Sequence, residues 1–354
     1  MRTLILAAGH LNDELRARIE AGDEPRLDVF DLQAELKADL LDFTDVDRSK
    51  RITVRAARRA LGPSAALAVL GASERGRYDA ILTTGEDIGI PLAALLKLGK
   101  APSHTMIAHT LVPLKKRVFF KLPRLQDRID CILCYATSEE RHMIDRLSVP
   151  AEKARRIFFH ADDAFFRPEP GREEPDLVCS AGQLLRDYDS LIEAVSTLPV
   201  RLSIAAGSPW ISHRMKPRAA LPVNVDWQRY TRKELRELYA RSAVAVVPIF
   251  ENDYQTGIST ILEMMAAGKC VIATRTRGQT DTIIDGVTGI YVPPGDPAAL
   301  RRAIERVLGD REEAGRIGRA ARAFIEKEAS TRIFVDRVAS AVRGRPYPTL
   351  APRA

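Results

Sequence analysis

The sequence lacks the features that mark several classes of protein. Its 354 residues include only four cysteines, and aromatic residues make up 6%. No apolar run reaches the length needed to span a membrane. The opening MRTLILAAGH enters a strand-like segment that is too short for a signal-peptide core followed by a cleavage site. We therefore expect a soluble, cytoplasmic protein that is at most peripheral on the inner face of a membrane.

Zinc-finger spacings and RNA-recognition signatures are also absent, so we expect no nucleic-acid partner. Cys131 and Cys134 form a C-x-x-C, but RIDCILCYATS reads as a buried strand, and no second Cys or His pair lies nearby at zinc spacing. The pattern favours packing cysteines in a reducing compartment and no metal site. The formal charge of +7 comes largely from arginine, which suits phosphates and carboxylates as well as anionic membranes.

Short apolar runs alternate with helical patterns along the whole chain, which is longer than one hydrophobic core usually serves. This alternation predicts an α/β fold with two doubly wound parallel sheets, and with ligand bound at the carboxyl ends of the strands. We expect a helix after Asp296 as N-cap and a helix that ends at Gly268. The strand-like runs are TLILAAG, LDVFDL, YDAILTTG, TMIAHT and CILCYATS, then DLVCSAG, VRLSIAAG, VAVVPI, CVIAT and GIYVPP, and TDTIIDG reads as a short helix.

The domain organisation follows from a connector at residues 159–174, which is rich in proline, glycine and charge. We expect one Rossmann-like domain over residues 1–168 and a second over residues 169–330. A C-terminal helix and tail over residues 331–354 is expected to return to the first domain.

The segment YQTGISTILEMMAAGKCVIAT, Tyr254–Thr274, has the strongest local signal. A strand is followed by a loop with Gly257 and by a helix that begins near Ser259, which presents unpaired N–H groups and the positive helix end to an anion. Glu263, one turn into the helix, is able to accept hydrogen bonds from a ribose diol. The alternative is a capped amphipathic helix with Glu263 as an ordinary exposed residue.

That segment, with the following RGQTDTIIDGVTGIYVPPGDPAALRRAI, resembles the signature of the retaining GT-B glycosyltransferases of family 4, also called glycosyl transferases group 1. The D-G-x-T-G-x-x-V-P-P-G-D pattern is nearly intact at Asp285–Asp296. The resemblance covers the whole chain and is strongest from about Val178. It implies a GT-B fold with two domains facing a central cleft, the first binding the acceptor and the second the donor. The implied reaction moves a sugar, with retention, from a UDP- or GDP-type nucleotide sugar to a small-molecule, glycan or lipid acceptor, without cofactor or metal.

The resemblance also implies roles for residues of the second domain. Glu263 takes the second position of the family's Glu-x7-Glu pattern, which binds the ribose, and Gln255 takes the first. An amide at that position still bonds sugar hydroxyls but carries no charge. Other residues implied to bind the donor are Gly257, Ile258, Ser259, Thr260 and Lys269.

SAGQLLRDYDSLIEA, Ser180–Ala194, resembles the family segment G-R-L-x-x-x-K-G, whose basic residues hold the pyrophosphate. Gly182 matches the glycine, Arg186 takes the lysine position and Gln183 replaces the first basic residue. Arg186 is therefore the residue that we expect to neutralise the leaving diphosphate. The alternative is an exposed loop arginine.

In the first domain, His109 ends the strand of MIAHTLVP, where related enzymes carry a histidine that contacts the donor sugar. His109 is grouped with Arg186 and Gln255 as catalytic, although a histidine at a strand end is more often structural. Gly9 in ILAAGH is expected near the diphosphate, and Glu86 and Asp87, which follow Gly85, are expected on the acceptor side. A solvated acidic turn explains that last group equally well.

The segment 111–128, LVPLKKRVFFKLPRLQDR, mixes cations with apolar residues. It predicts peripheral contact with anionic lipid, or a phosphate of the acceptor bound by Lys116. The alternative is a core-facing helix with a solvated basic face. Two other functions remain open: a non-catalytic sugar-nucleotide-binding module, and a phosphorylase or epimerase on the same scaffold.

Overall fold

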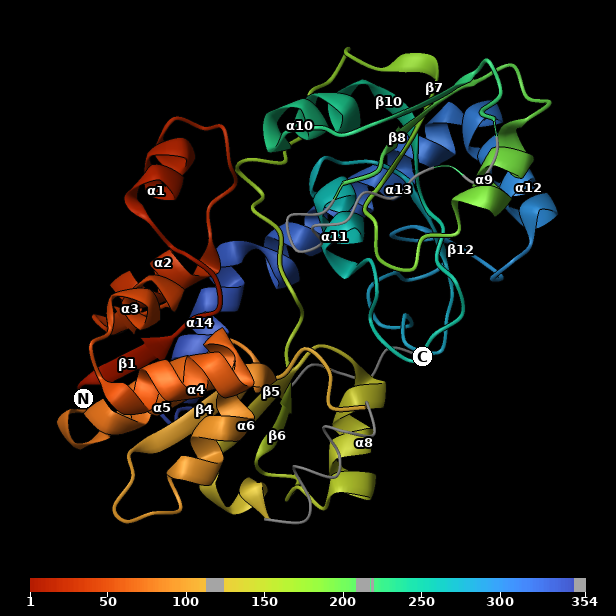
Figure 1. The fold of residues 1–354 in the computed structure, drawn as a ribbon. Coiled ribbons are helices and arrows are strands. Elements are labelled where there is room, and N and C mark those ends of the chain that lie inside the picture. The colour runs from red at the N-terminus through yellow and green to blue at the C-terminus, as the bar shows by residue number, and fades with distance from the viewer. Residues whose placement is uncertain (113–123, 208–216, 218–219, 347–354) are drawn as a thin grey trace. The chain divides into compact units, whose positions relative to one another are not determined.

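The structure is a computed structural model that describes residues 1–112, 124–207, 217 and 220–346. The chain forms two compact units (Figure 1). Unit 1 comprises Met1–Glu20, Leu27–Phe158 and the described residues from Arg332 onward. Unit 2 comprises Ala21–Arg26 and Phe159–Thr331. Each unit has its own parallel sheet, and the sequence prediction of two Rossmann-like domains is confirmed.

In the described part of unit 1, six parallel strands lie in the order β2-β1-β3-β4-β5-β6. The order reverses between β1 and β3, so that these two neighbours form the switch point of the sheet. The side chains of β1 and β3 are all buried, and all but Thr3 and Thr83 are apolar, as expected where helices cover a parallel sheet. The strands are β1 (Thr3–Leu6), β2 (Asp39–Leu41), β3 (Ala80–Thr83), β4 (Ser103–Ile107), β5 (Cys131–Cys134) and β6 (Ala154–Arg156).

The helices of unit 1 include one that the sequence reading missed. LDVFDL was expected to be a strand, but its residues begin helix α2, because Val29, Leu32 and Leu36 recur on one helical face and are buried together. The second strand instead follows it. The helices are α1 (Asp13–Glu20), α2 (Asp28–Leu36), α3 (Phe43–Arg48), α4 (Ile52–Leu61), α5 (Pro63–Glu74), α6 (Glu86–Leu95), α8 (Thr137–Leu147) and α14 (Thr331–Val342), with short 3₁₀ turns η1 (Arg75–Arg77) and η2 (Leu125–Arg128).

Unit 2 has six described parallel strands in the order β12-β11-β10-β7-β8-β9. Here β7 and β10 are the central neighbours, and the chain leaves them toward opposite sides of the sheet, which defines a second switch point. The strands are β7 (Glu174–Ala181), β8 (Arg201–Ala205), β9 (Val225–Gln228), β10 (Ser242–Val247), β11 (Val271–Thr274) and β12 (Ile290–Val292).

Most helices of unit 2 begin at a residue whose side chain caps the first amides. The Asp296 carboxylate accepts a hydrogen bond from the Ala299 N–H at 2.8 Å, and Pro297 opens the helix, which confirms the expected cap. TDTIIDG was expected to be a helix but forms turns. The helices are α9 (Tyr188–Val195), α10 (Arg232–Arg241), α11 (Ile258–Ala266), α12 (Pro297–Gly309) and α13 (Arg311–Phe324), followed by a π-helical turn η3 (Ile325–Ala329). Within the described ranges, no helix combines the length and apolar character needed to cross a membrane.

The four cysteines are buried and free. Cys131 and Cys134 lie in β5, as the prediction of a packed strand requires. Burial raises the pKa of the Cys131 thiol to about 11, so this side chain stays a neutral packing group at ordinary pH.

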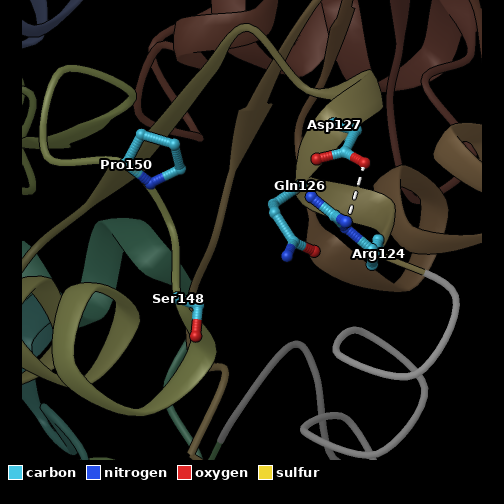
Figure 2. Close-up of a pocket in the computed structure, with 5 residues that line it drawn as sticks. All are labelled: Arg124, Gln126, Asp127, Ser148 and Pro150. Atoms are coloured by element: carbon cyan, nitrogen blue, oxygen red, sulfur yellow. Dashed lines mark ion pairs between the residues drawn. The ribbon is translucent and has the colours of Figure 1, made fainter.

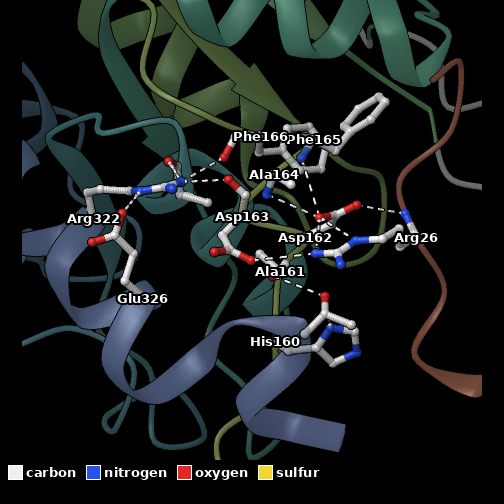
Figure 3. Close-up of polar contacts among 12 residues, drawn as sticks. Arg26, His160, Ala161, Asp162, Asp163, Ala164, Phe165, Phe166, Arg322 and Glu326 are labelled. Carbon is white, nitrogen blue, oxygen red and sulfur yellow. Dashed lines mark hydrogen bonds and ion pairs between the residues drawn. The ribbon is translucent and has the colours of Figure 1, made fainter. Parts of the chain in front are cut away.

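The segment Ala21–Arg26 belongs to unit 2 although its neighbours on both sides belong to unit 1. Asp162 holds it: the buried carboxylate accepts from the Arg26 backbone N–H at 2.7 Å and from the Arg26 guanidinium at 2.9 and 3.1 Å (Figure 3). Burial acts to raise the pKa of Asp162, but the bonds from Arg26 outweigh it and hold that pKa below its usual range. Beside it, Ala161 pairs with Ser330 in a short parallel bridge.

Candidate functional site

The candidate site lies at the carboxyl ends of β7 and β10 in unit 2. The two strands are hydrogen-bonded neighbours, with Val246 opposite Ser180. The loops that follow them, residues 182–187 and 248–257, therefore start side by side at the switch point of the sheet. A backbone bridge between Arg186 and Ile249 joins the two loops.

Arg186 is 4% exposed and lies between these loops. Its Nε donates to the Ala181 carbonyl at 2.8 Å, its Nη1 to the Leu184 carbonyl at 2.9 Å, and its Nη2 to the Thr260 hydroxyl at 3.1 Å. A guanidinium has five N–H groups. Toward the described residues, these three bonds leave one N–H on each terminal nitrogen, which is the arrangement that binds two oxygens of one phosphate.

Two glycines with positive φ make room for this guanidinium. Gly182 (φ 98°) and Gly257 (φ 82°) adopt conformations that disfavour other residues. A Cβ at Gly182 would overlap the guanidinium, and a Cβ at Gly257 would come within 3.2 Å of Arg186 Nη1. A glycine is therefore required at position 182, where the family pattern also has one, because any larger residue would displace Arg186.

The charge of Arg186 is not offset by a close anion. No carboxylate in the described part of the chain lies within ion-pair distance of it, and burial lowers the pKa of Arg186 from its ordinary value. The residue remains a cation, because an arginine in a protein does not lose its proton. Burying a charge without a partner costs several kcal/mol, so this position favours an incoming anion.

The first turn of helix α11 lies next to this arginine, which donates to the Thr260 hydroxyl. Its N-cap is Gly257, which has no side chain to bond the first amides. Ile258 is partly buried, Ser259 is exposed, and Thr260 is buried against Arg186. The first amides of a helix have no acceptor within the helix, so this end adds N–H donors and a partial positive charge to the arginine.

Glu263 lies one turn further along α11, on the same face as Thr260. Its Oε1 accepts from Arg232 Nη2 at 2.5 Å, and its Oε2 accepts from the Tyr239 hydroxyl at 3.4 Å. The carboxylate is buried, so the alternative of an ordinary exposed residue is wrong. The exposed-loop alternative for Arg186 is wrong for the same reason.

Gln255 lies in the loop before α11 and is partly buried. Its Oε1 is buried and has no hydrogen-bond partner among the described residues. A buried amide oxygen without a donor is unfavourable by about 1–3 kcal/mol, so this position accepts a hydroxyl readily.

Lys269 does not join this group, which corrects the expectation that it binds the donor. It precedes β11, at the amino-terminal edge of the sheet, whereas Arg186 and Glu263 lie at the carboxyl edge. Its ammonium donates to Glu173 at 2.7 Å and to the Ala240 carbonyl at 3.0 Å, both of which lie at that same amino edge. The Lys269 ammonium is therefore already neutralised by its ion pair with Glu173.

The expected residues of unit 1 follow the carboxyl ends of β1, β3 and β4. Gly9 follows β1 with φ 110° and donates no side chain to the site. Glu86, in the first turn of α6, is buried, and its carboxylate accepts from the His109 backbone N–H at 2.8 Å. The His109 ring donates through Nε2 to the Thr84 carbonyl at 3.0 Å and is exposed. Glu86 thus fixes the backbone that carries His109.

Two other residues lie at this edge. Asp87 follows Glu86 and is exposed. His10, the residue after Gly9, bonds Asp47 through Nε2 at 3.1 Å, and Arg58 pairs with the other oxygen of that carboxylate. Lys116 and most of the basic segment lie outside the described residues.

A separate cavity of about 310 Å³ lies in unit 1 beside η2 and is lined by Arg124, Gln126, Asp127, Ser148 and Pro150 (Figure 2). Its residues precede β5 and β6, so it lies at the amino edge of the sheet, opposite His109 and Glu86. Arg124 pairs with Asp127 at 3.4 Å, so the charge lining the cavity is offset. None of the predicted site residues lines it.

The two Rossmann-like units define a GT-B fold, and solved structures support this class. A sucrose-phosphate synthase from Thermosynechococcus elongatus superimposes with a TM-score of 0.72 at 17% identity, covering 97% of this chain and 99% of that one. HepE of Anabaena, solved in complex with UDP and glucose, has a TM-score of 0.70 at 14% identity, with 97% and 99% covered.

Residues 176–310 match the family model described as glycosyl transferases group 1. Sulfoquinovosyl transferase SQD2 of Arabidopsis thaliana is 28% identical over 194 residues, covering 52% of this chain and 37% of that protein. D-inositol 3-phosphate glycosyltransferase of Frankia alni is 28% identical over 223 residues, covering 53% and 54%. The chain thus spans about half or less of the length of these relatives. Residues 176–310 are thus similar to the glycosyl transferases group 1, and the two units have the GT-B fold.

Sequence reasoning missed two contacts of the site. Arg232 and Tyr239 both bond Glu263, but they lie more than twenty residues before it in another helix, and no spacing rule connects them. The His10–Asp47 pair was missed although His10 stands next to Gly9. A histidine in the loop after the first strand of a Rossmann-like domain was the available signal.

Proposed function

We propose that this protein transfers a glycosyl group from a nucleoside diphosphate sugar of the UDP or GDP type to an acceptor hydroxyl. The observation that carries the proposal is the buried guanidinium of Arg186 at the switch point of unit 2, which forms no ion pair with any described residue. A diphosphate supplies the missing negative charge. Glu263, on the same helix face, supplies acceptors for the sugar of the nucleoside.

The same residues suit the leaving group. As the bond between the anomeric carbon and the phosphate oxygen breaks, its electron pair passes to the β-phosphate. The two remaining N–H groups of Arg186 and the first amides of α11 are donors aimed at that charge. Fixed donors of this kind usually make the largest catalytic contribution.

We further propose that transfer retains the anomeric configuration, needs no cofactor or metal, and takes place on the cytoplasmic side. The family resemblance supports retention, and HepE, which has been solved with UDP and with UDP-glucose, supports a nucleotide donor. The acceptor is proposed to bind at the carboxyl edge of unit 1, near His109 and Asp87. Gln255 is proposed to bond a hydroxyl of the donor sugar.

One observation favours a second mechanism within the same class. His10 is exposed, and its Nε2 is held by Asp47, which leaves Nδ1 to accept a proton. An acceptor hydroxyl at His10 would pass its proton to Nδ1 as its oxygen attacks the anomeric carbon. Such a base serves an inverting transfer, because the oxygen then attacks from the face opposite the phosphate.

A panel of nucleotides and nucleotide sugars, measured by thermal shift, is the first test. A ligand at about 100 times its Kd adds ~2.7 kcal/mol of stability, so a true donor gives a clear shift. Slow hydrolysis of the selected donor without acceptor supports an enzyme, whereas binding without any turnover supports a non-catalytic module. Proton NMR of the first sugar released distinguishes retention from inversion, and unchanged turnover in His10→Gln would eliminate the second mechanism.

A further inference from the structure

Glu263 is held from two sides by residues of a single helix. Arg232 is the first residue of α10, and Tyr239 lies two turns later. The capping box of Thr231 and Glu234 fixes the start of this helix, with Thr231 accepting from the Glu234 N–H at 3.2 Å. The Tyr239 ring is fully buried, and the Arg232 and Glu263 side chains are 24% and 9% exposed.

The ring of Phe166 fixes the Arg232 guanidinium in a second direction. The guanidinium carbon lies 5.3 Å from the centroid of that ring, and the Phe166 and Tyr239 rings are 5.7 Å apart. A planar guanidinium stacks on an aromatic face and bonds a carboxylate in its own plane, which an ammonium cannot do. The Phe166 ring and the Glu263 carboxylate together restrict the orientation of the Arg232 guanidinium, and its bond to Oε1 in turn orients the carboxylate.

The ion pair also balances the charge of Arg232. Burial alone would lower the pKa of Arg232, but the adjacent Glu263 carboxylate outweighs it and raises that pKa. A lone buried charge at this depth would be costly, so the two side chains stabilise each other.

The bonding capacity that remains matches a vicinal diol. An ionised carboxylate has about four lone-pair sites, two on each oxygen. Arg232 uses one site on Oε1 and Tyr239 uses one on Oε2. Counting the described residues, each oxygen therefore keeps one site, and two neighbouring hydroxyls that donate to the two oxygens would complete the set.

We propose that Arg232 is a positioning residue, which together with Tyr239 holds the Glu263 carboxylate aligned to bind the cis-diol of a ribonucleotide. The inference rests on the proposed function, because it takes the nucleoside of the donor as the ligand of Glu263. It adds that the preference of the site for ribose over 2′-deoxyribose depends on Arg232, a residue that need not touch the ligand.

The test measures Kd by calorimetry for UDP against 2′-deoxy-UDP, and for GDP against 2′-deoxy-GDP. The wild type is expected to bind the ribonucleotide about tenfold to a hundredfold more tightly, as the loss of one hydrogen bond to a charged group predicts. Arg232→Met should reduce that ratio to near one, and Arg232→Lys should give an intermediate ratio. Arg236→Met is the matched control: Arg236 lies one turn later in α10, over the Phe165 ring, and within the described part of the chain it forms no hydrogen bond with Glu263.

Several results would overturn the inference. If Arg232→Met weakens both nucleotides equally and leaves the ratio intact, the pair with Glu263 is structural only. If the wild type binds the ribonucleotide and the 2′-deoxyribonucleotide with equal Kd, the diol is not bound at this site. If Arg232→Met fails to fold, the Arg232→Lys ratio decides. Glu263→Ala with unchanged nucleotide affinity would refute the ribose role in the proposed function itself, separately from Arg232.

Discussion

Replacing Arg186 with alanine removes three hydrogen bonds and the only positive charge that we place at the diphosphate. The bonds to the Ala181 and Leu184 carbonyls and to the Thr260 hydroxyl each stabilise the folded unit by roughly 0.5–1.5 kcal/mol. Part of this loss is offset, because the variant no longer buries an unpaired cation. We therefore expect a modest loss of folding stability, of about 1–3 kcal/mol.

The effect on ligand binding and turnover should be larger and specific. A lost charged hydrogen bond predicts a decrease in diphosphate affinity of about 1.5–3 kcal/mol, and the free nucleoside should bind as before. Removing a donor that stabilises transition-state charge usually lowers kcat by about 100- to 1000-fold, or ~2.7–4 kcal/mol. Arg186→Lys retains the charge without the two-pronged geometry, so its affinity and kcat should fall between wild type and Arg186→Ala.

The assay compares Kd for the selected nucleoside diphosphate with Kd for its nucleoside, and then measures kcat and KM for donor turnover. Arg241→Ala is a suitable control, because Arg241 pairs with Glu174 at the opposite edge of the same sheet. Equal losses for diphosphate and nucleoside would indicate a distorted site rather than a lost phosphate contact. A higher KM with unchanged kcat would make Arg186 a uniform binder, and no change in either would refute its assignment to the leaving group.

Three further results are expected. Glu263→Ala should weaken nucleoside diphosphate binding by roughly 1–3 kcal/mol, measured by calorimetry, and unchanged affinity would contradict the ribose role. Arg26→Met should lower folding stability by about 1–3 kcal/mol at pH 7. Because the folded-state pKa of Asp162 lies below its unfolded value of ~3.9, this difference should shrink in thermal melts as the pH falls below about 4, and a constant difference would exclude the ion pair as its cause. Flotation with anionic liposomes should detect binding that weakens with salt, as the basic segment 111–128 predicts, and salt-independent binding would refute an electrostatic contact.

The two parallel sheets and the loops after β7 and β10 could be predicted because they depend on local signals. Apolar runs mark buried parallel strands, and the glycines at 182 and 257 mark the tight turns after β7 and β10. The prediction of a strand at LDVFDL was wrong because a short apolar run is compatible with both the strand and the helix period. Only the continuation to Leu36 shows the helical period. The prediction that Lys269 binds the donor was wrong because a motif gives only a position in the chain. The folded sheet shows at which edge that position lies.

The hydrogen-bond partners of Glu263 could not be predicted from the sequence. Arg232 is one of many arginines in an arginine-rich chain, and nothing in its neighbours distinguishes it. Its position beside Glu263 results from the packing of α10 against the central strands, which brings together residues 31 positions apart. Side-chain pairs of this kind appear only when the tertiary structure is known.

The way in which Asp162 holds Ala21–Arg26 limits how this protein can be divided or recombined. A gene fragment that encodes Phe159–Thr331 has the whole of one sheet but not the arginine that neutralises its buried aspartate. A gene fragment for the second half therefore cannot be exchanged by itself, because it leaves out the segment that contains Arg26. A chimera that takes its second half from another protein would also need to replace six residues near the start of the first. Recombination that respects this requirement should give stable hybrids, and a simple exchange at the connector should not.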